Sequence, residues 1–160
     1  PTSGETARIL IVEDESLVAL DIRKTLERHG YAVVGVESSG EAALRRLEQQ
    51  PADLVLMDIK LAGALDGIQT AYHVRSTFDT PVILLTAFAD DATLERAKRS
   101  EPFAYLLKPF TERELRTTIV IALYRHQAEA RIAERERLFS TTLRSISDAV
   151  IVTDADDRID

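Results

Sequence analysis

Five short apolar segments, separated by stretches with helical periodicity, limit the folds open to this chain more than any other feature. Four of the segments run directly into residues that carry chemistry: residues 8–12 precede Glu13 and Asp14, residues 53–57 precede Asp58, residues 81–85 precede Thr86, and residues 103–107 precede Lys108. A fifth, residues 31–36, follows Gly30, a residue type that often ends a helix. Nearly continuous apolar runs are typical of strands that are covered on both faces of a sheet.

The intervals between these segments favour helices. Apolar spacing predicts helices at roughly residues 15–29, around residues 42–47, around residues 68–78 and, more weakly, after residue 91. Ser38 or Ser39 can cap the second helix, and Thr111 with Glu114 forms a capping-box pattern for a fifth. Five strands that alternate with five helices predict an α/β fold with a doubly wound, five-stranded parallel sheet and an extended last helix.

Composition excludes several classes of protein. The 160 residues suffice for one good core, with some length left over. The net charge of −7 gives no support for direct nucleic-acid binding, and the absence of cysteine excludes disulfides and thiolate metal sites. No apolar run approaches the roughly 20 residues of a membrane span, and no secretory leader is visible. We therefore expect a cytoplasmic protein with no membrane contact.

The residues that end the strands predict a phosphoryl-transfer site. The carboxyl ends of parallel strands lie at one edge of a sheet, where open α/β folds bind ligands. Glu13, Asp14 and Asp58 would repel one another there unless a cation or some protons are bound, and an oxygen-only ligand set favours Mg²⁺. Asp58 ends the middle strand and is our candidate nucleophile, with Lys108 and Thr86 contacting the phosphoryl oxygens. The alternative is that these acidic residues are helix caps and Lys108 is a surface charge.

The motifs at these strand ends resemble those of one family. They are Ile11-Val12-Glu13-Asp14, Leu56-Met57-Asp58-Ile59, Leu85-Thr86-Ala87 and Leu107-Lys108-Pro109-Phe110. Residues 8 to about 125 thus resemble a receiver domain of two-component response regulators, which has a flavodoxin-like fold. The resemblance implies that Asp58 accepts a phosphoryl group from the phosphohistidine of a histidine kinase or phosphotransfer protein.

The same resemblance assigns further roles. Glu13, Asp14, Asp58 and the backbone carbonyl of Lys60 would bind Mg²⁺. Thr86 and Tyr105 would form a switch pair, in which Tyr105 turns inward when Thr86 turns toward the phosphate. The Lys108–Pro109 peptide bond would be cis. Lys60 and Phe88 would border the path of the attacking water, and we expect the bulk of Phe88 to slow self-hydrolysis; the alternative is that Phe88 is simply a packed loop residue.

Two segments depart from the common receiver pattern. In the loop after Asp58, Ala62 stands where many receivers have proline, and there is one additional residue before Asp66-Gly67. Residues 100–103 replace the more usual Gly-Ala before the last strand, close to the output face of the family.

Two other classes of function are considered. A haloacid-dehalogenase-like phosphatase also forms an aspartyl phosphate, but its nucleophile lies in an Asp-x-Asp pair after the first strand, where this chain has Glu13-Asp14-Glu15. An interaction module that works without phosphate would keep the fold alone, and the presence of Asp58, Thr86 and Lys108 argues against it.

The last helix extends beyond the receiver-like segment. We expect a tail at residues 1–7, a receiver at 8–125, a helical linker at 126–146 and a further segment at 147–160. Alternating four- and three-residue steps, at Leu115, Ile119, Ala122 and His126 and again in a shifted frame at Phe139, Leu143 and Ile146, favour a coiled-coil homodimer. A single surface helix that packs on its own sheet and then frays explains the pattern equally well.

The end of the chain carries a second, weaker resemblance. Residues 138–143 and 147–154 are similar to the opening of a PAS sensor domain, where a helix leads into a first strand. The resemblance implies that residues 147–160 begin a PAS domain within a longer protein, with a histidine kinase or a diguanylate cyclase as the output.

Overall fold

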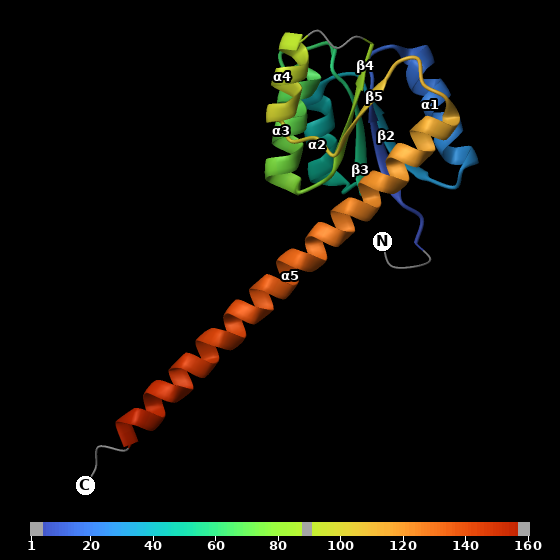
Figure 1. Ribbon diagram of the computed structural model, residues 1–160. Coiled ribbons are helices and arrows are strands. Elements are labelled where there is room, and N and C mark those ends of the chain that lie inside the picture. Colours follow the sequence, from blue (N-terminus) through green and yellow to red (C-terminus); the bar gives the residue numbers. More distant parts are fainter. Residues whose placement is uncertain (1–4, 88–90, 157–160) are drawn as a thin grey trace. The chain divides into compact units, whose positions relative to one another are not determined.

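The predicted five-stranded parallel sheet is present in the computed structural model, which describes residues 5–87 and 91–156, with side chains as far as residue 146. The strands lie in the order β2-β1-β3-β4-β5 (Figure 1). They are β1 (Arg8–Val12), β2 (Ala32–Glu37), β3 (Leu54–Asp58), β4 (Val82–Thr86) and β5 (Ala104–Leu107). The helices are α1 (Ser16–Arg28), α2 (Gly40–Gln49), α3 (Gly67–Phe78), α4 (Asp91–Arg99) and α5 (Glu112–Asp156).

Helices cover both faces of the sheet, so alternate residues of each central strand enter different cores. On one face α1 and the start of α5 pack on residues such as Ile11, Leu56 and Leu85. On the other face α2, α3 and α4 pack on residues such as Val12 and Met57. Burial on both sides explains why these strands are apolar on both faces rather than at alternate positions.

Side chains expected at the helix starts form the caps. Ser39 accepts a hydrogen bond from Ala42 N at 3.3 Å and so caps α2. At the start of α5, Glu114 N donates to Thr111 Oγ1 at 3.2 Å and Thr111 N donates to Glu114 Oε2 at 2.7 Å. These pairs satisfy backbone N–H groups that the helices leave without partners.

The chain divides into two compact units, one ending at Tyr124 and the other beginning at Arg125. In the first unit Leu115, Ile119 and Ala122 are buried in the core beside α1. Their assignment to a coiled-coil seam is therefore wrong, because a helix that packs on a sheet shows the same apolar spacing. The later positions are different: Phe139, Leu143 and Ile146 are all exposed.

The structure also differs from the expectation for the end of the chain. The resemblance to a PAS domain implied a strand within residues 147–154, but α5 continues through them to Asp156. A helix satisfies its own backbone hydrogen bonds, whereas a strand needs a paired neighbour, and none of the described strands pairs with this segment.

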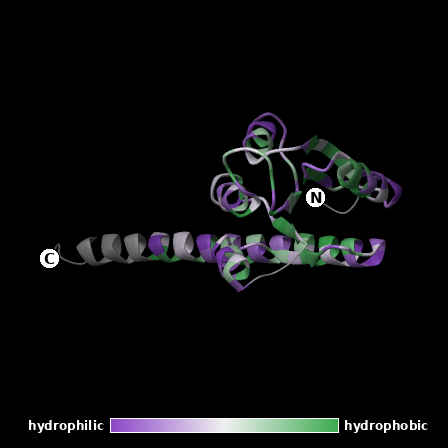
Figure 2. Ribbon diagram, turned by 90° about the horizontal axis from the view of Figure 1, so that it is seen from above, coloured by the Kyte–Doolittle hydropathy of each residue, from purple (hydrophilic) through white to green (hydrophobic). Residues whose placement is uncertain are grey.

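Hydrophilic and hydrophobic residues are intermixed along the part of α5 that Figure 2 colours by hydropathy. Across residues 5–87 and 91–156, none of the helices has both the length and the apolar character needed to traverse a lipid bilayer.

Candidate functional site

Three carboxylates meet at the carboxyl edge of the sheet. Glu13 and Asp14 directly follow β1, and Asp58 is the last residue of the adjacent strand β3. Each offers an oxygen atom within 4.8 Å of the other two. Glu13 is 2% exposed and Asp58 is 6% exposed, while Asp14 is exposed to solvent. The three carboxylates therefore lie close together, as the sequence predicts.

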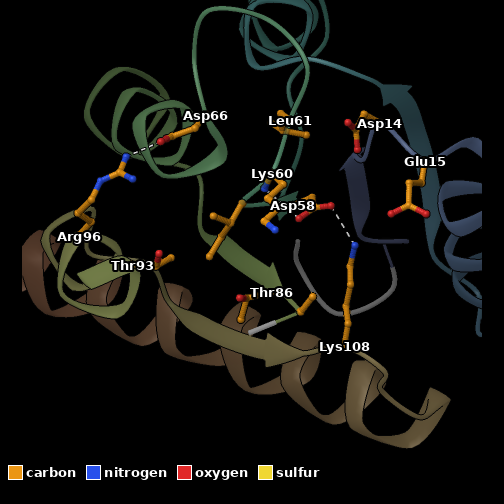
Figure 3. Close-up of a pocket in the computed structure, with 12 residues that line it drawn as sticks. Asp14, Glu15, Asp58, Lys60, Leu61, Asp66, Thr86, Thr93, Arg96 and Lys108 are labelled. Atoms are coloured by element: carbon orange, nitrogen blue, oxygen red, sulfur yellow. Dashed lines mark hydrogen bonds and ion pairs between the residues drawn. The ribbon is translucent and has the colours of Figure 1, made fainter. Parts of the chain in front are cut away.

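Lys108 reaches this cluster from the end of β5. Its Nζ atom donates to Glu13 Oε2 at 2.6 Å and to Asp58 Oδ2 at 2.9 Å. Figure 3 shows the side chains of Lys108 and Asp58 pointing toward one another. Lys108 N donates to Thr86 O at 2.7 Å, and the Lys108–Pro109 peptide bond is cis, the isomer that the resemblance implied.

Burial and charge act against each other at these groups. Burial raises the pKa of the Glu13 carboxyl, and the hydrogen bond from Lys108 offsets that effect only in part. Burial alone would lower the pKa of the Lys108 ammonium, but its hydrogen bonds to Glu13 and Asp58 outweigh burial and raise it. One ammonium group pairs with two of the three carboxylates, and the cluster retains a negative balance that favours a cation.

The cluster opens into a pocket of about 680 Å³ (Figure 3). Thr86, buried at the end of β4, lines this pocket together with Asp14, Asp58 and Lys108. The pocket thus combines carboxylates, a hydroxyl group and an ammonium group from the ends of four strands. This is the set of groups that the sequence placed at one edge of the sheet.

The loop that follows β3 supports Asp58 through its backbone. Lys60 N donates to Asp58 Oδ1 at 3.1 Å, and Ile59 N donates to Leu85 O at 3.1 Å. The side chain of Lys60 is exposed and lines the pocket.

Sequence reasoning missed the opposite wall of the pocket. Arg96 on α4 forms an ion pair with Asp66, the N-cap residue of α3, and Thr93 also lines this side (Figure 3). Asp66 caps α3 by accepting from Gln69 N at 2.8 Å. The Asp-Gly pair at the start of α3 was visible in the sequence, but the partner on α4 depends on how the two helices face each other.

The remaining candidate residues lie outside the cluster. Tyr105 is on β5, paired with Leu84 of β4, and its side chain is 37% exposed. Phe88 falls outside the described residues.

The ligand chemistry of the cluster fits a hard divalent cation. All three candidate ligand groups are carboxylates. Among the described residues, no histidine or cysteine belongs to this group. Magnesium and calcium prefer oxygen ligands of this kind, and magnesium usually binds through only one or two carboxylates with several waters. An exposed Asp14 beside two buried carboxylates leaves room for those waters.

Comparison with known proteins identifies the family. The family model for the response regulator receiver domain matches residues 9–120 of the sequence. The chain belongs to the response regulator receiver family. The matched segment covers the five strands, apart from the first residue of β1, and the start of α5, and it contains Glu13, Asp14, Asp58, Thr86 and Lys108.

Several relatives of this receiver are known. The transcriptional regulatory protein PdtaR of Mycobacterium tuberculosis is 38% identical over 118 residues, which cover 74% of this chain and 57% of that protein. The chain thus spans little more than half the length of this curated relative.

Solved receiver domains have the same fold. The signal receiver domain of a modulated diguanylate cyclase from Desulfovibrio desulfuricans is 40% identical, with a TM-score of 0.75 and coverage of 78% of this chain and 99% of that one. The N-terminal domain of a response regulator/sensory box/GGDEF three-domain protein from Carboxydothermus hydrogenoformans is 35% identical, with a TM-score of 0.71 and coverage of 77% and 98%.

Proposed function

We propose that this receiver takes a phosphoryl group onto Asp58 from the phosphohistidine of a histidine kinase or phosphotransfer protein. The observation that carries the proposal is the position of Lys108 Nζ, 2.6 Å from Glu13 and 2.9 Å from Asp58. An ammonium group held beside one oxygen of the acceptor is placed to neutralise charge that arrives with a phosphoryl group.

In the proposed reaction an oxygen of Asp58 attacks phosphorus while the bond between phosphorus and the imidazole nitrogen breaks. The imidazole keeps the electron pair of that bond and takes up a proton, and Asp58 becomes an acyl phosphate. Lys108 faces the acceptor oxygen, and the hydroxyl group of Thr86 would donate to a phosphoryl oxygen. Mg²⁺, held by Glu13, Asp14, Asp58 and the carbonyl of Lys60, would supply additional positive charge to the transferred group.

The output would be a shift between two conformations of the receiver. Contacts that exist only with the phosphorylated form bias such an equilibrium. Thr86 would turn toward the phosphoryl group, and the ring of Tyr105, now 37% exposed, would turn inward. The comparison of Tyr105 exposure with and without a phosphoryl mimic, by NMR, tests this switch.

Phosphorylation itself is tested by incubating the chain with Mg²⁺ and acetyl phosphate. A receiver gains one hydroxylamine-labile phosphate on the parent chain and none on Asp58→Asn, as measured by intact mass. Continuous release of phosphate from small esters would indicate the phosphatase alternative, which the family match does not favour. Absence of any reaction would indicate an interaction module.

We also propose that Lys60 and Phe88 set the lifetime of the phosphorylated form. Lys60 lines the pocket beside Asp58. In the proposal the bulk of Phe88 hinders the attacking water, so that Phe88→Ala loses phosphate faster than the parent. An unchanged rate of decay would refute this role of Phe88.

The second unit is proposed to connect the receiver to an output domain as a homodimeric coiled coil. Exposed Ile132, Phe139 and Ile146 recur at every seventh residue of α5, and Leu143 lies between the last two. The output domain would belong to a cytoplasmic sensor kinase or diguanylate cyclase that also contains a PAS domain. A three-domain relative that combines a response regulator, a sensory box and GGDEF supports this organisation.

A further inference from the structure

The loop between β3 and α3 is held in place by a side chain from α2. The carboxylate oxygen Oε1 of Glu41 accepts hydrogen bonds from Ala64 N at 2.8 Å and from Leu65 N at 3.0 Å. These N–H groups lie in the segment that carries one residue more than the common receiver pattern. Glu41 thus supplies the acceptor for two backbone N–H groups of this longer loop.

The start of α2, which carries Glu41, is packed against its neighbours. It lies in the first turn of α2, after the cap residue Ser39, which forms an isolated parallel bridge with Ala62 of the loop. The preceding Gly40 packs against Thr70 of α3 so closely that a β-carbon would lie 2.0 Å from Thr70 Oγ1. Because α2 and α3 are in such close contact there, the backbone of Glu41 is fixed in position relative to α3.

The loop backbone at Gly63 also lies close to the Glu41 carboxylate. Gly63 has φ +106°, and a β-carbon on it would lie 2.6 Å from Glu41 Oε2. Hydrogen bonds from the backbone N–H groups of Glu41 itself, Leu65 and Ala64 lower the pKa of the Glu41 carboxyl. Glu41 therefore remains ionised at neutral pH, and charge-assisted hydrogen bonds of this kind are stronger than neutral ones.

The held loop in turn contacts the acceptor. Its second residue, Lys60, donates its N–H to Asp58 Oδ1 at 3.1 Å, and the loop closes where Gly67 N donates to Ile59 O at 2.9 Å. A shift in the middle of this short loop must move Lys60, and with it both the orientation of Asp58 and the carbonyl group that the proposed function gives to the cation.

We propose that Glu41 is a positioning residue, which sets the carboxylate of Asp58 and the carbonyl of Lys60 by fixing the loop after β3. The inference rests on the proposed function for its link to phosphorylation, but its structural part is independent of that link. Groups that orient metal ligands without touching the metal typically change metal affinity by about 10- to 100-fold when removed.

The test uses Glu41→Ala and Glu41→Gln, with Glu48→Ala as a matched control, because Glu48 is exposed on the same helix. Hydrogen exchange of the Ala64 and Leu65 amides in the metal-free protein should become about tenfold faster in Glu41→Ala. The carboxyl carbon resonance of Asp58 should shift, and calorimetry should show Mg²⁺ affinity lowered by about tenfold. Glu41→Gln keeps an oxygen acceptor and should restore most of each property, and Glu48→Ala should match the parent.

Exchange rates and an Asp58 resonance that do not differ between Glu41→Ala and the parent would overturn the inference, as would a Glu41→Gln variant that behaves like Glu41→Ala. Neither readout depends on phosphorylation. If the parent takes up no phosphate, the proposed function fails, while the metal-free measurements still decide the role of Glu41.

Discussion

Gly67 lies against the backbone carbonyl of Asp58 so closely that a β-carbon on Gly67 would be 1.9 Å from Asp58 O. The first residue of α3 and the last residue of β3 are therefore in backbone contact. No side chain fits between them, and this contact sets the distance between Asp58 and the start of α3.

Substitution of Gly67 by alanine is expected to lower the free energy of unfolding by about 3 kcal/mol, because a backbone atom cannot move aside as a flexible side chain can. Gly30→Ala is the control: Gly30 has φ +83° but no atom within 4 Å of a β-carbon. That change should cost only about 1 kcal/mol of backbone strain. Urea denaturation measures both, and equal losses would contradict the steric explanation.

Removal of Lys108 should make the protein more dependent on divalent cations. Lys108→Ala leaves Glu13 and Asp58 without their ammonium partner, so we expect Mg²⁺ to raise the melting temperature more than it does in the parent. Phosphate uptake from acetyl phosphate at saturating Mg²⁺ should fall by about 100-fold. A variant that reacts at the parental rate would show that the ammonium group is dispensable.

Mg²⁺ affinity should distinguish the carboxylates of the cluster from a neighbour outside it. Glu13→Gln and Asp14→Asn each remove a charged ligand, and each should weaken binding by about tenfold or more. Glu15→Gln is the control, because Glu15 lines the same pocket but is not in the cluster. If titration calorimetry shows that all three variants lose Mg²⁺ affinity equally, the loss comes from the lower negative charge of the pocket and not from the removal of a ligand.

The stability of the fold should depend on Asp53 at low pH. Asp53 Oδ2 accepts from Arg8 N at 2.7 Å, and although burial opposes ionisation of Asp53, its hydrogen bonds with Arg8 lower its pKa below 3.8. The unfolded chain thus binds more protons than the folded protein in the window below this value, so stability falls as pH decreases through the window. Melting temperatures measured as the pH is lowered from about 6 to about 2, through the usual aspartate pKa of about 3.9, should fall more steeply for the parent than for Asp53→Asn.

The exposed apolar positions of the second unit should control oligomeric state. Phe139→Glu places a charge in the proposed seam and should weaken the dimer by at least about tenfold. The adjacent Leu138 is also exposed but lies off the seven-residue repeat, so Leu138→Glu should have little effect. Sedimentation velocity across a concentration series measures both variants, and a parent chain that stays monomeric throughout would rule out the seam.

The elements near the sheet could be predicted from sequence because their signals are local. Apolar runs indicate the strands, and a parallel arrangement of those strands brings Glu13, Asp58 and Lys108 together at one edge of the sheet. The pairs Glu41 with Ala64 and Arg96 with Asp66 could not be predicted, since they depend on how α2 and α4 face a loop of unusual length.

Helical spacing was the less reliable signal. The pattern at Leu115, Ile119 and Ala122 fits a coiled coil and a helix packed on a sheet equally well, and burial decides for the sheet. Residues 147–154 include an apolar segment for which the resemblance implied a strand, but the segment is helical. Short apolar segments without a neighbouring strand carry little information on which of the two structures forms.

The order of the strands has a consequence for the proposed role of Asp58 as phosphoryl acceptor. Only β3 has β1 on one side and β4 on the other. Asp58 is thus flanked by the acidic pair on one side and by a hydroxyl group on the other, and no other strand end has both neighbours. A chain whose termini were relocated would keep this reactivity if it kept the order of the strands. An exchange of β1 and β2 would abolish it even with every residue type retained.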